Sequence, residues 1–529
     1  RRGYLWNDGK DPEDLALQRW GVIAPEGPEG DALLAAIAPA LTLALACGHR
    51  GETSAPPPEP AKSAPPPAPE PAPDTREPST WAGSVALPGS SLRLIVHLEP
   101  AEGEGWSGTI DIPAQGVKGH PLRDIEVADK GLDFVYAPPG APEGRWAIFS
   151  IEHEAGASEG AGMLEQGGAS FPLTLRRLAP GEDAGPARPQ TPKEPFPYAA
   201  REIEVQSGEL RLACTMVIPE GEGPFAAAAL LSGSGAQDRD EAIFDHRPFA
   251  VLADHLARAQ IASLRCDDRG VGGSSGKYLD TSEDELAADA LAMVDALSGD
   301  ARVRPAAIGV IGHSEGGIIG PLAALKEPKK VAFVVMLAGP GLPGATVLGE
   351  QLRDIAAAGG AEAAAIDANA AAQQALIKSI RAGKGREVIA EEMSALVRLQ
   401  TADKALDDAA ITALVDRQVD MMTSPWFRSF LESDPAKVLR KLKRPPVLAL
   451  VGERDLQVRA STNLPAIARA LKAAGNRDVT TRALPGLNHM FQPASSGQVE
   501  EYQDIETTID PTVLELVTAW IAERFGQAG

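Results

Sequence analysis

The pentapeptide Gly312-His313-Ser314-Glu315-Gly316 places a serine where a protein fold can make it a nucleophile. Residues 306–311 before it are apolar or small and predict a buried strand, and residues 317–325 after it predict a packed helix. A strand, the pattern Gly-x-Ser-x-Gly and a helix together form a nucleophile elbow, a strained turn that lifts the serine hydroxyl above the sheet. The alternative is an ordinary strand-to-helix turn. We predict nucleophilic catalysis at Ser314.

A serine hydroxyl is a weak nucleophile by itself, so a general base and an acid that orients the base must follow. Only one of the eight histidines, His489, lies downstream of Ser314, in a loop after the predicted strand 479–484. Loops at strand ends carry the catalytic groups of open α/β sheets. His489 is therefore the predicted base, and a surface loop histidine is the alternative.

The acid is predicted at the end of another strand. Residues 446–451 form a continuous apolar run of the buried-strand type, and residues 452–455 turn away from its end. Asp455 lies past the turn and is the predicted acid, with Glu453 as the second choice. Asp455 is expected to accept a hydrogen bond from His489 and so fix the tautomer of its ring.

An oxyanion hole is predicted in the loop that follows the strand 226–231. Small residues in the segment 232–240 let backbone N–H groups turn toward a substrate carbonyl. Ser234 is the first choice of donor in this loop and Gly235 the second, together with the N–H of Glu315. The alternative is a flexible glycine-serine turn.

The glycine-rich segment 267–276 superficially resembles a phosphate-binding loop. Its glycine pattern fails at the third position, where Ser275 stands, and the lysine of a P-loop is absent. We therefore expect a structural turn in which Asp268 and Arg269 brace neighbouring loops. No histidine–carboxylate spacing suggests a metal, and no cofactor is expected.

The region 200–529 resembles bacterial two-domain esterases of the EstD type, in the serine aminopeptidase-like group of the α/β-hydrolases. The resemblance lies in residues 232–241, 268–276, 312–317, 424–427, 452–458, 487–492 and 502–506. It implies an α/β-hydrolase fold and hydrolysis of carboxylic esters with short acyl chains through Ser314, Asp455 and His489. One departure is Ala236, where the resemblance leads us to expect proline; the change should soften the turn without removing a donor.

Residues 341–440 are predicted to form a helical cap, because a simple crossover needs only about a dozen residues. The segment is rich in alanine, which favours helices. Trp426 and Phe427 at its end are predicted to line an acyl pocket, and core packing is about equally favoured.

Residues 81–180 show short alternating runs between glycine and proline turns, which predict a small all-β domain. It carries no catalytic constellation, so a structural or substrate-gating role is the default. Carbohydrate or lipid binding through Trp81, Trp106 or Trp146 is the less favoured alternative, because strand tryptophans are usually core residues. Residues 181–200 are predicted to link this domain to the hydrolase domain, 201–529.

The N-terminal region suggests export. Residues 1–47 are predicted as a leader whose apolar segment 32–47 suits the core of a signal peptide, and its end resembles a lipobox with Cys47 as the lipidated residue. Residues 48–80 are dominated by proline and alanine and predict a semi-rigid tether. The expected location is extracytoplasmic, as a membrane-anchored lipoprotein. The alternative is a cytoplasmic protein with a disordered leader, since acidic residues stand where a signal peptide is basic.

Composition agrees with an enzyme of two domains. The chain has 529 residues and a net charge of −23, which argues against nucleic acid and acidic membrane surfaces as partners. Cys214 and Cys266 are expected on neighbouring strands as two buried thiols, with a bridge as the less favoured alternative.

The sequence thus predicts a serine carboxylesterase acting on small-molecule esters. A peptidase or amidase with the same triad is the nearest alternative, and a catalytically vestigial binding protein is a more distant one. The physiological substrate and the oligomeric state are left open.

Overall fold

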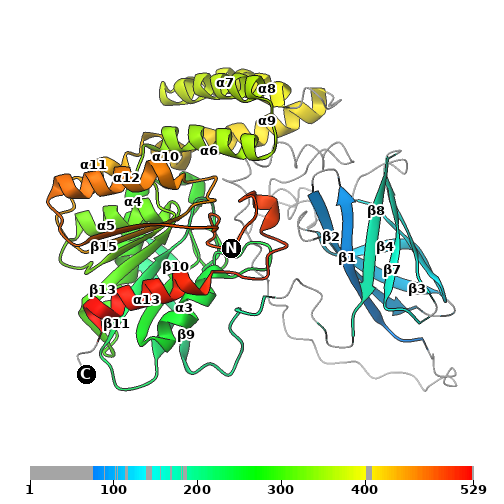
Figure 1. Ribbon diagram of the computed structural model, residues 1–529, viewed down its shortest axis with the longest axis horizontal. Helices are drawn as coiled ribbons and strands as arrows, with labels where there is room; N and C mark the ends of the chain where they lie inside the picture. The colour runs from blue at the N-terminus through cyan, green and yellow to red at the C-terminus, as the bar shows by residue number, and fades with distance from the viewer. Residues whose placement is uncertain are drawn as a thin grey trace, which may run out of the picture.

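A computed structural model of the chain describes residues 76–526, apart from 88–89, 102, 104, 113–116, 139–145, 155, 167–168, 180–181, 183–187 and 401–407. The predicted leader, almost all of the predicted tether and Cys47 lie outside the described residues. Figure 1 shows a β-barrel beside a larger α/β domain that carries a layer of helices. None of the helices described is both long enough and apolar enough to cross a membrane.

The first domain is a closed barrel of eight antiparallel strands in sequence order, with β1 paired to both β2 and β8. Side chains alternate between the interior and the solvent, as in β6, where Ala147, Phe149 and Ile151 are buried. The strands are β1 (Ser79–Leu87), β2 (Ser90–Pro100), β3 (Trp106–Ile112), β4 (Val117–Ala128), β5 (Gly131–Tyr136), β6 (Ala147–Glu152), β7 (Glu159–Gln166) and β8 (Ala169–Arg177).

The three barrel tryptophans occupy different environments. Trp81 is 5% exposed and belongs to the barrel core. Trp106 and Trp146 are half-buried, and the guanidinium groups of Arg76 and Arg123 lie over their rings at 5.5 and 5.3 Å from the ring centroids. Trp81 therefore packs as predicted, whereas a ligand-binding role of the other two stays an untested alternative.

The second domain has an eight-stranded sheet in the order β16-β15-β14-β13-β11-β12-β10-β9. The strands β11 to β16 all run parallel to one another. At one edge of the sheet, β10 pairs antiparallel with β12, and β9 pairs antiparallel with β10. The central strands are buried on both faces, as expected for a parallel sheet with helices on each side. The strands are β9 (Tyr198–Ser207), β10 (Leu210–Pro219), β11 (Phe225–Leu231), β12 (Ile261–Cys266), β13 (Val303–His313), β14 (Val334–Leu337), β15 (Val447–Gly452) and β16 (Val479–Leu484).

Helices cover both faces of this sheet (Figure 1). Helices α4, α5, α11 and α12 pack on one face, and α3 and α13 pack on the other. The start of α4 is fixed by a capping box between Ser282 and Glu285. The elements are α3 (Pro248–Arg258), η4 (Tyr278–Asp280), α4 (Glu283–Ser298), α5 (Gly316–Lys326), α11 (Pro435–Leu439), α12 (Ala460–Ala474), η5 (Val499–Glu501) and α13 (Pro511–Phe525). The arrangement is the predicted α/β-hydrolase fold.

The helical cap lies between β14 and β15, in the predicted region. It comprises α6 (Gly344–Ala358), α7 (Ala363–Arg381), α8 (Arg386–Gln400), α9 (Asp408–Met422) and α10 (Pro425–Glu432). Its helices share an apolar core of their own, which includes Leu376, Met393 and Trp426 and extends to Tyr278 of the main domain. The cap is therefore a packed layer attached to the sheet domain (Figure 1).

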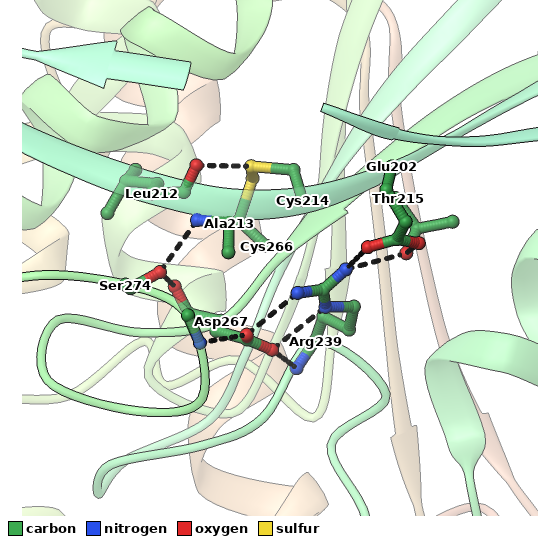
Figure 2. Close-up of a disulfide and its surroundings, with 10 residues drawn as sticks. Glu202, Leu212, Ala213, Cys214, Thr215, Arg239, Cys266, Asp267 and Ser274 are labelled. Atoms are coloured by element: carbon green, nitrogen blue, oxygen red, sulfur yellow. Dashed lines mark hydrogen bonds and ion pairs between the residues drawn. A yellow bond between two sulfur atoms is a disulfide. The ribbon is translucent and has the colours of Figure 1, made fainter. Parts of the chain in front are cut away.

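Cys214 and Cys266 form a disulfide, with an S–S distance of 1.99 Å. Our expectation of two buried thiols was wrong. The two strands are antiparallel neighbours, and their register places Cys214 of β10 directly opposite Cys266 of β12, with the Cα atoms 3.9 Å apart. Figure 2 shows the bridge beside Asp267, which follows Cys266 and accepts three hydrogen bonds from Arg239, two from its guanidinium group and one from its backbone N–H.

The segment between the two domains binds the hydrolase domain. Arg188 donates hydrogen bonds to the carbonyl oxygens of Phe244, Gln503 and Ile505, at 2.7 to 3.3 Å. The Gln190 side chain bridges the backbone of residues 508 and 509. Part of the predicted linker is thus docked on the segment that follows the His489 loop.

Candidate active site

Ser314 stands at the end of β13 in a backbone conformation that non-glycine residues rarely adopt, with φ of +51°. Its N–H donates to the carbonyl of Leu337 at 2.8 Å. A Cβ atom added to Gly312 would lie 2.0 Å from the carbonyl oxygen of Gly316, and one added to Gly316 would lie 2.2 Å from that of Leu231. The two glycines are therefore required for the strand and helix α5 to meet, which is the geometry of the predicted elbow.

His489 and Asp455 form a buried pair close to this elbow. The Nδ1 atom of His489 lies 2.8 Å from Oδ2 of Asp455, and the residues are 3% and 4% exposed. The other carboxyl oxygen of Asp455 accepts the N–H groups of Gln457 and Val458, each at 2.8 Å. One oxygen of Asp455 is thereby anchored to the backbone while the other holds the imidazole. Glu453, the second choice for this role, is exposed at the turn.

The loop that carries His489 is held by a buried polar network. The side chains of Asn488 and Gln492 bond to each other, and Asn488 Oδ1 also accepts the N–H of Gln492. Gln492 in turn contacts His246, which bonds to Thr508 and to the carbonyl of Tyr502. Because every member is buried and hydrogen-bonded, the network fixes the position of the loop that carries His489.

The predicted oxyanion loop lies beside Ser314, and both Ser234 and Ser314 line one cavity. Asp268 braces this loop, accepting bonds from the Ser232 hydroxyl at 3.1 Å and from the N–H of Gln237 at 2.9 Å. Burial, with a contribution from the nearby Glu315, raises the pKa of Asp268 well above its ordinary value.

Arg269 binds Asp289 of α4 through two nitrogens, at 2.6 and 3.0 Å. With Asp268, it makes the segment 267–276 the structural turn that the sequence predicted. Within the described residues, no group of three or more His, Cys, Asp and Glu side chains is arranged to hold a metal ion.

A narrow cavity of about 70 Å³ opens at Ser314 and extends under the cap. Trp426 and Phe427 line it and are also buried in the cap core, at 2% and 3% exposure. Each ring therefore both lines the cavity and packs in the cap core, so the two alternatives considered for these residues are compatible. The remaining lining is mostly apolar or amide-bearing and includes Val347, Leu348, Gln351, Gln373, Met421 and Met422.

Glu315 contributes a buried carboxyl group to the cavity lining, which the sequence analysis did not foresee. It accepts a hydrogen bond from the Tyr278 hydroxyl at 2.7 Å and from the Trp426 indole at 3.0 and 3.2 Å. Burial raises the pKa of Glu315 to about 7, although both hydrogen bonds act in the opposite direction. The sequence assigned this residue only a backbone N–H, and its position as N-cap of α5 is consistent with that role.

Glu241 and His313 were also missed. Both side chains are buried, and Nδ1 of His313 lies 2.8 Å from Oε1 of Glu241. Nε2 of His313 contacts the carbonyl oxygen of His489. The available signal was weak: His313 lies two residues after the predicted buried strand 306–311, and a buried histidine requires hydrogen-bond partners. The sequence offered no means of naming those partners.

Residues 246–492 match the family described as serine aminopeptidase, S33. Over 331 residues, 62% of this chain and 69% of the relative, the chain is 26% identical to esterase EstD of Thermotoga maritima. Over these spans the chain resembles α/β-hydrolases of the EstD type. The predicted family resemblance and the predicted class, carboxylic ester hydrolase, are confirmed by this similarity.

Solved structures similar to this chain include two esterases. The Pf2001 esterase of Pyrococcus furiosus is 16% identical, with a TM-score of 0.40 over 64% of this chain and 98% of that one. Est1E of Butyrivibrio proteoclasticus, solved with ferulic acid bound, is 17% identical, with a TM-score of 0.34 over 61% of this chain and 96% of that one.

Proposed function

We propose that this EstD-type hydrolase is a serine carboxylesterase that hydrolyses short-chain acyl esters through Ser314, His489 and Asp455. The observation that carries the proposal is the buried 2.8 Å contact between His489 and Asp455, on loops next to a nucleophile elbow. A base oriented by a carboxylate beside a strained serine is the arrangement that activates a hydroxyl for acyl transfer.

The proposed reaction has two halves. Ser314 Oγ attacks the ester carbonyl carbon while His489 takes the hydroxyl proton, and the N–H groups of Glu315 and Ser234 bind the oxyanion. The tetrahedral intermediate collapses, the C–O bond to the alcohol breaks, and His489 returns the proton to the departing alcohol. Water then attacks the acyl-enzyme in the same way and regenerates Ser314. Asp455 holds the ring and stabilises its charged form.

The preference for short acyl chains is supported by the cavity. It holds only about 70 Å³, and the rings of Trp426 and Phe427 line it. A buried methylene group that fits such a wall gains about 0.8 kcal/mol, whereas one that does not fit costs packing energy. We therefore expect a narrow optimum at short chains.

Two measurements test this function. A fluorophosphonate probe should label Ser314 covalently, and absence of labelling would favour a vestigial, binding-only domain. Turnover of nitrophenyl esters with acyl chains of increasing length should exceed turnover of aminoacyl anilides. Faster turnover of the anilides than of the esters would make the chain a peptidase or amidase. The match to the serine aminopeptidase family is compatible with that alternative.

We also propose an extracytoplasmic location, with a lipid anchor at Cys47. The proposal is supported by the disulfide between Cys214 and Cys266, because disulfides persist in oxidising compartments and are rare in the reducing cytosol. The proposed partners are a small-molecule ester and, through the anchor, a membrane.

A further inference from the structure

A second histidine–carboxylate pair lies next to the proposed catalytic groups. Nδ1 of His313 is 2.8 Å from Oε1 of Glu241, and the two side chains are 8% and 3% exposed. Nε2 of the same ring is 3.1 Å from the carbonyl oxygen of His489. The proposed reaction uses neither side chain, although both are among the most costly kinds of group to bury.

The partners of His313 indicate its protonation state. A neutral imidazole has one donor nitrogen and one acceptor nitrogen, whereas both nitrogens of His313 face acceptors. The carbonyl of His489 can only accept, and the Glu241 oxygen already accepts the N–H of Gly233 at 2.6 Å. Both ring nitrogens therefore donate, and the pair is an imidazolium bound to a carboxylate.

The electrostatic surroundings agree with this state. Burial alone lowers the pKa of His313, but the charge and hydrogen bond of Glu241 and the carbonyl of His489 outweigh burial and raise it.

The pair joins three separate segments of the site. Glu241 binds Gly233, which begins the oxyanion loop; His313 immediately precedes Ser314; and His313 holds the backbone of His489. The contacts are close, because a Cβ atom added to Gly233 would lie 3.0 Å from Glu241 Oε1 and 3.3 Å from the Ser314 Cβ. Glu241 itself is held at φ of +53°, a conformation that non-glycine residues adopt only when their surroundings impose it.

We propose that the Glu241–His313 ion pair is a positioning device that fixes the oxyanion loop and the His489 loop relative to Ser314. The proposal rests on the esterase mechanism above and adds two positioning residues to it. Neither residue lines the cavity at Ser314, so each acts through the placement of groups that do.

The decisive variants are Glu241→Gln and His313→Gln. Glutamine keeps the approximate size of Glu241 but removes the charge, so His313 loses the anion that holds it as an imidazolium. A displacement of about 1 Å at a reacting group costs on the order of 10²-fold in rate. We expect kcat to fall about 10²-fold with KM within about threefold, and the double variant to be no worse than either single one, because the two residues act as a unit.

Two controls separate positioning from general stability. Asp478→Asn removes the negative charge of an ion pair, 2.8 Å long, between the residue just before β16 and Arg524 of α13. It should leave kcat at the native value. Glu241→Asp keeps the charge but withdraws the carboxylate, and should give an intermediate kcat. If both glutamine variants lower the melting temperature yet keep kcat within about threefold, the pair is merely structural and the proposal is wrong.

Nitrogen-15 NMR of histidine-labelled protein reads the ion pair directly and does not depend on turnover. The resonances of His313 are assigned as those that disappear in His313→Gln. They should show two protonated ring nitrogens in the wild type and one protonated ring nitrogen in Glu241→Gln. A neutral His313 in the wild type would overturn the proposal. Failure of the wild type to react with a fluorophosphonate would instead overturn the esterase function, and the two results are distinguishable.

Discussion

The indole nitrogen of Trp426 lies 3.0 and 3.2 Å from the two carboxyl oxygens of Glu315, the residue that follows the nucleophilic serine of the proposed mechanism. Trp426 belongs to α10, the last helix of the cap, and Glu315 caps α5 of the main domain. The Tyr278 hydroxyl completes the contact at 2.7 Å. The cap and the nucleophile elbow are thus joined by a buried carboxyl group, and a displacement of α10 relative to the elbow would break these hydrogen bonds.

The first prediction concerns the pH dependence of stability. The Glu315 pKa is about 7 in the folded chain against an ordinary value of 4.5, so folding favours the protonated carboxyl group. This contribution is fully present below pH 4.5 and is lost as the pH rises to about 7. The difference in unfolding free energy between the wild type and Glu315→Gln should fall over this window, by up to about 1.4 kcal/mol per pH unit.

Urea denaturation of both proteins from pH 4 to pH 9 measures this difference. Glu453→Gln, at an exposed site, is the matched control and should show no such slope. A difference that is flat across the window would show that Glu315 is ionised in the fold throughout.

The second prediction concerns the proposed triad. Ser314→Ala should abolish ester turnover while the melting temperature stays near the native value, because the hydroxyl performs chemistry rather than packing. His489→Ala should lose nearly as much kcat, and the double variant no more, since the residues act as one unit. Steady-state kinetics with a short nitrophenyl ester provides the measurement. Substantial activity in purified Ser314→Ala would rule out the mechanism.

The third prediction concerns the acyl pocket. Phe427→Ala should shift the preferred acyl chain length upward, because the ring lines the narrow cavity at Ser314. The control is Leu431→Ala on the same helix, a residue that is 1% exposed in the cap core but does not line the cavity. It should lower stability and leave the chain-length profile unchanged. If the two variants behave alike, Phe427 is a core residue without a part in specificity.

The fourth prediction concerns the disulfide. The bridge joins residues 52 positions apart, and a loop of that length corresponds to about 4 kcal/mol in the chain-entropy account. The variant Cys214→Ala/Cys266→Ala should lose stability of that order in denaturant titrations, and reductant should destabilise the wild type only. Alkylation before and after reduction, read by mass spectrometry, checks that the bond forms. Equal stability with and without reductant would contradict the expectation.

The fifth prediction concerns the proposed anchor. Expression in a bacterium should give a membrane-associated product that is acylated at Cys47, and Cys47→Ser should release it. Cell fractionation and mass spectrometry of the N-terminal peptide provide the readout. Wild-type protein in the cytosol would end the lipoprotein proposal without touching the esterase proposal.

Sequence alone predicted the parts of this chain whose signals are local. The strands that end near residues 231, 313 and 452 were visible as apolar runs, and the elbow as a glycine pattern within five residues. His489 was found because no other histidine lies downstream of Ser314.

The parts that escaped prediction depend on pairing between distant residues. Glu241 and His313 are 72 positions apart, and Glu315 and Trp426 are 111 apart. The Cys214–Cys266 bridge depends on the register of two strands, which composition does not reveal. Burial could be predicted for several of these residues, but the identity of their partners could not.

Closure of the N-terminal barrel leaves none of its eight strands with an unpaired side. A free strand edge is a template for the backbone of another chain, so the barrel cannot recruit neighbours in this way. Among the strands that the structure describes, only β9 and β16 are edge strands, and both belong to the hydrolase sheet. Within the part of the chain that the structure describes, association by strand addition, whether with a peptide or with a second copy, would therefore have to begin on the hydrolase domain.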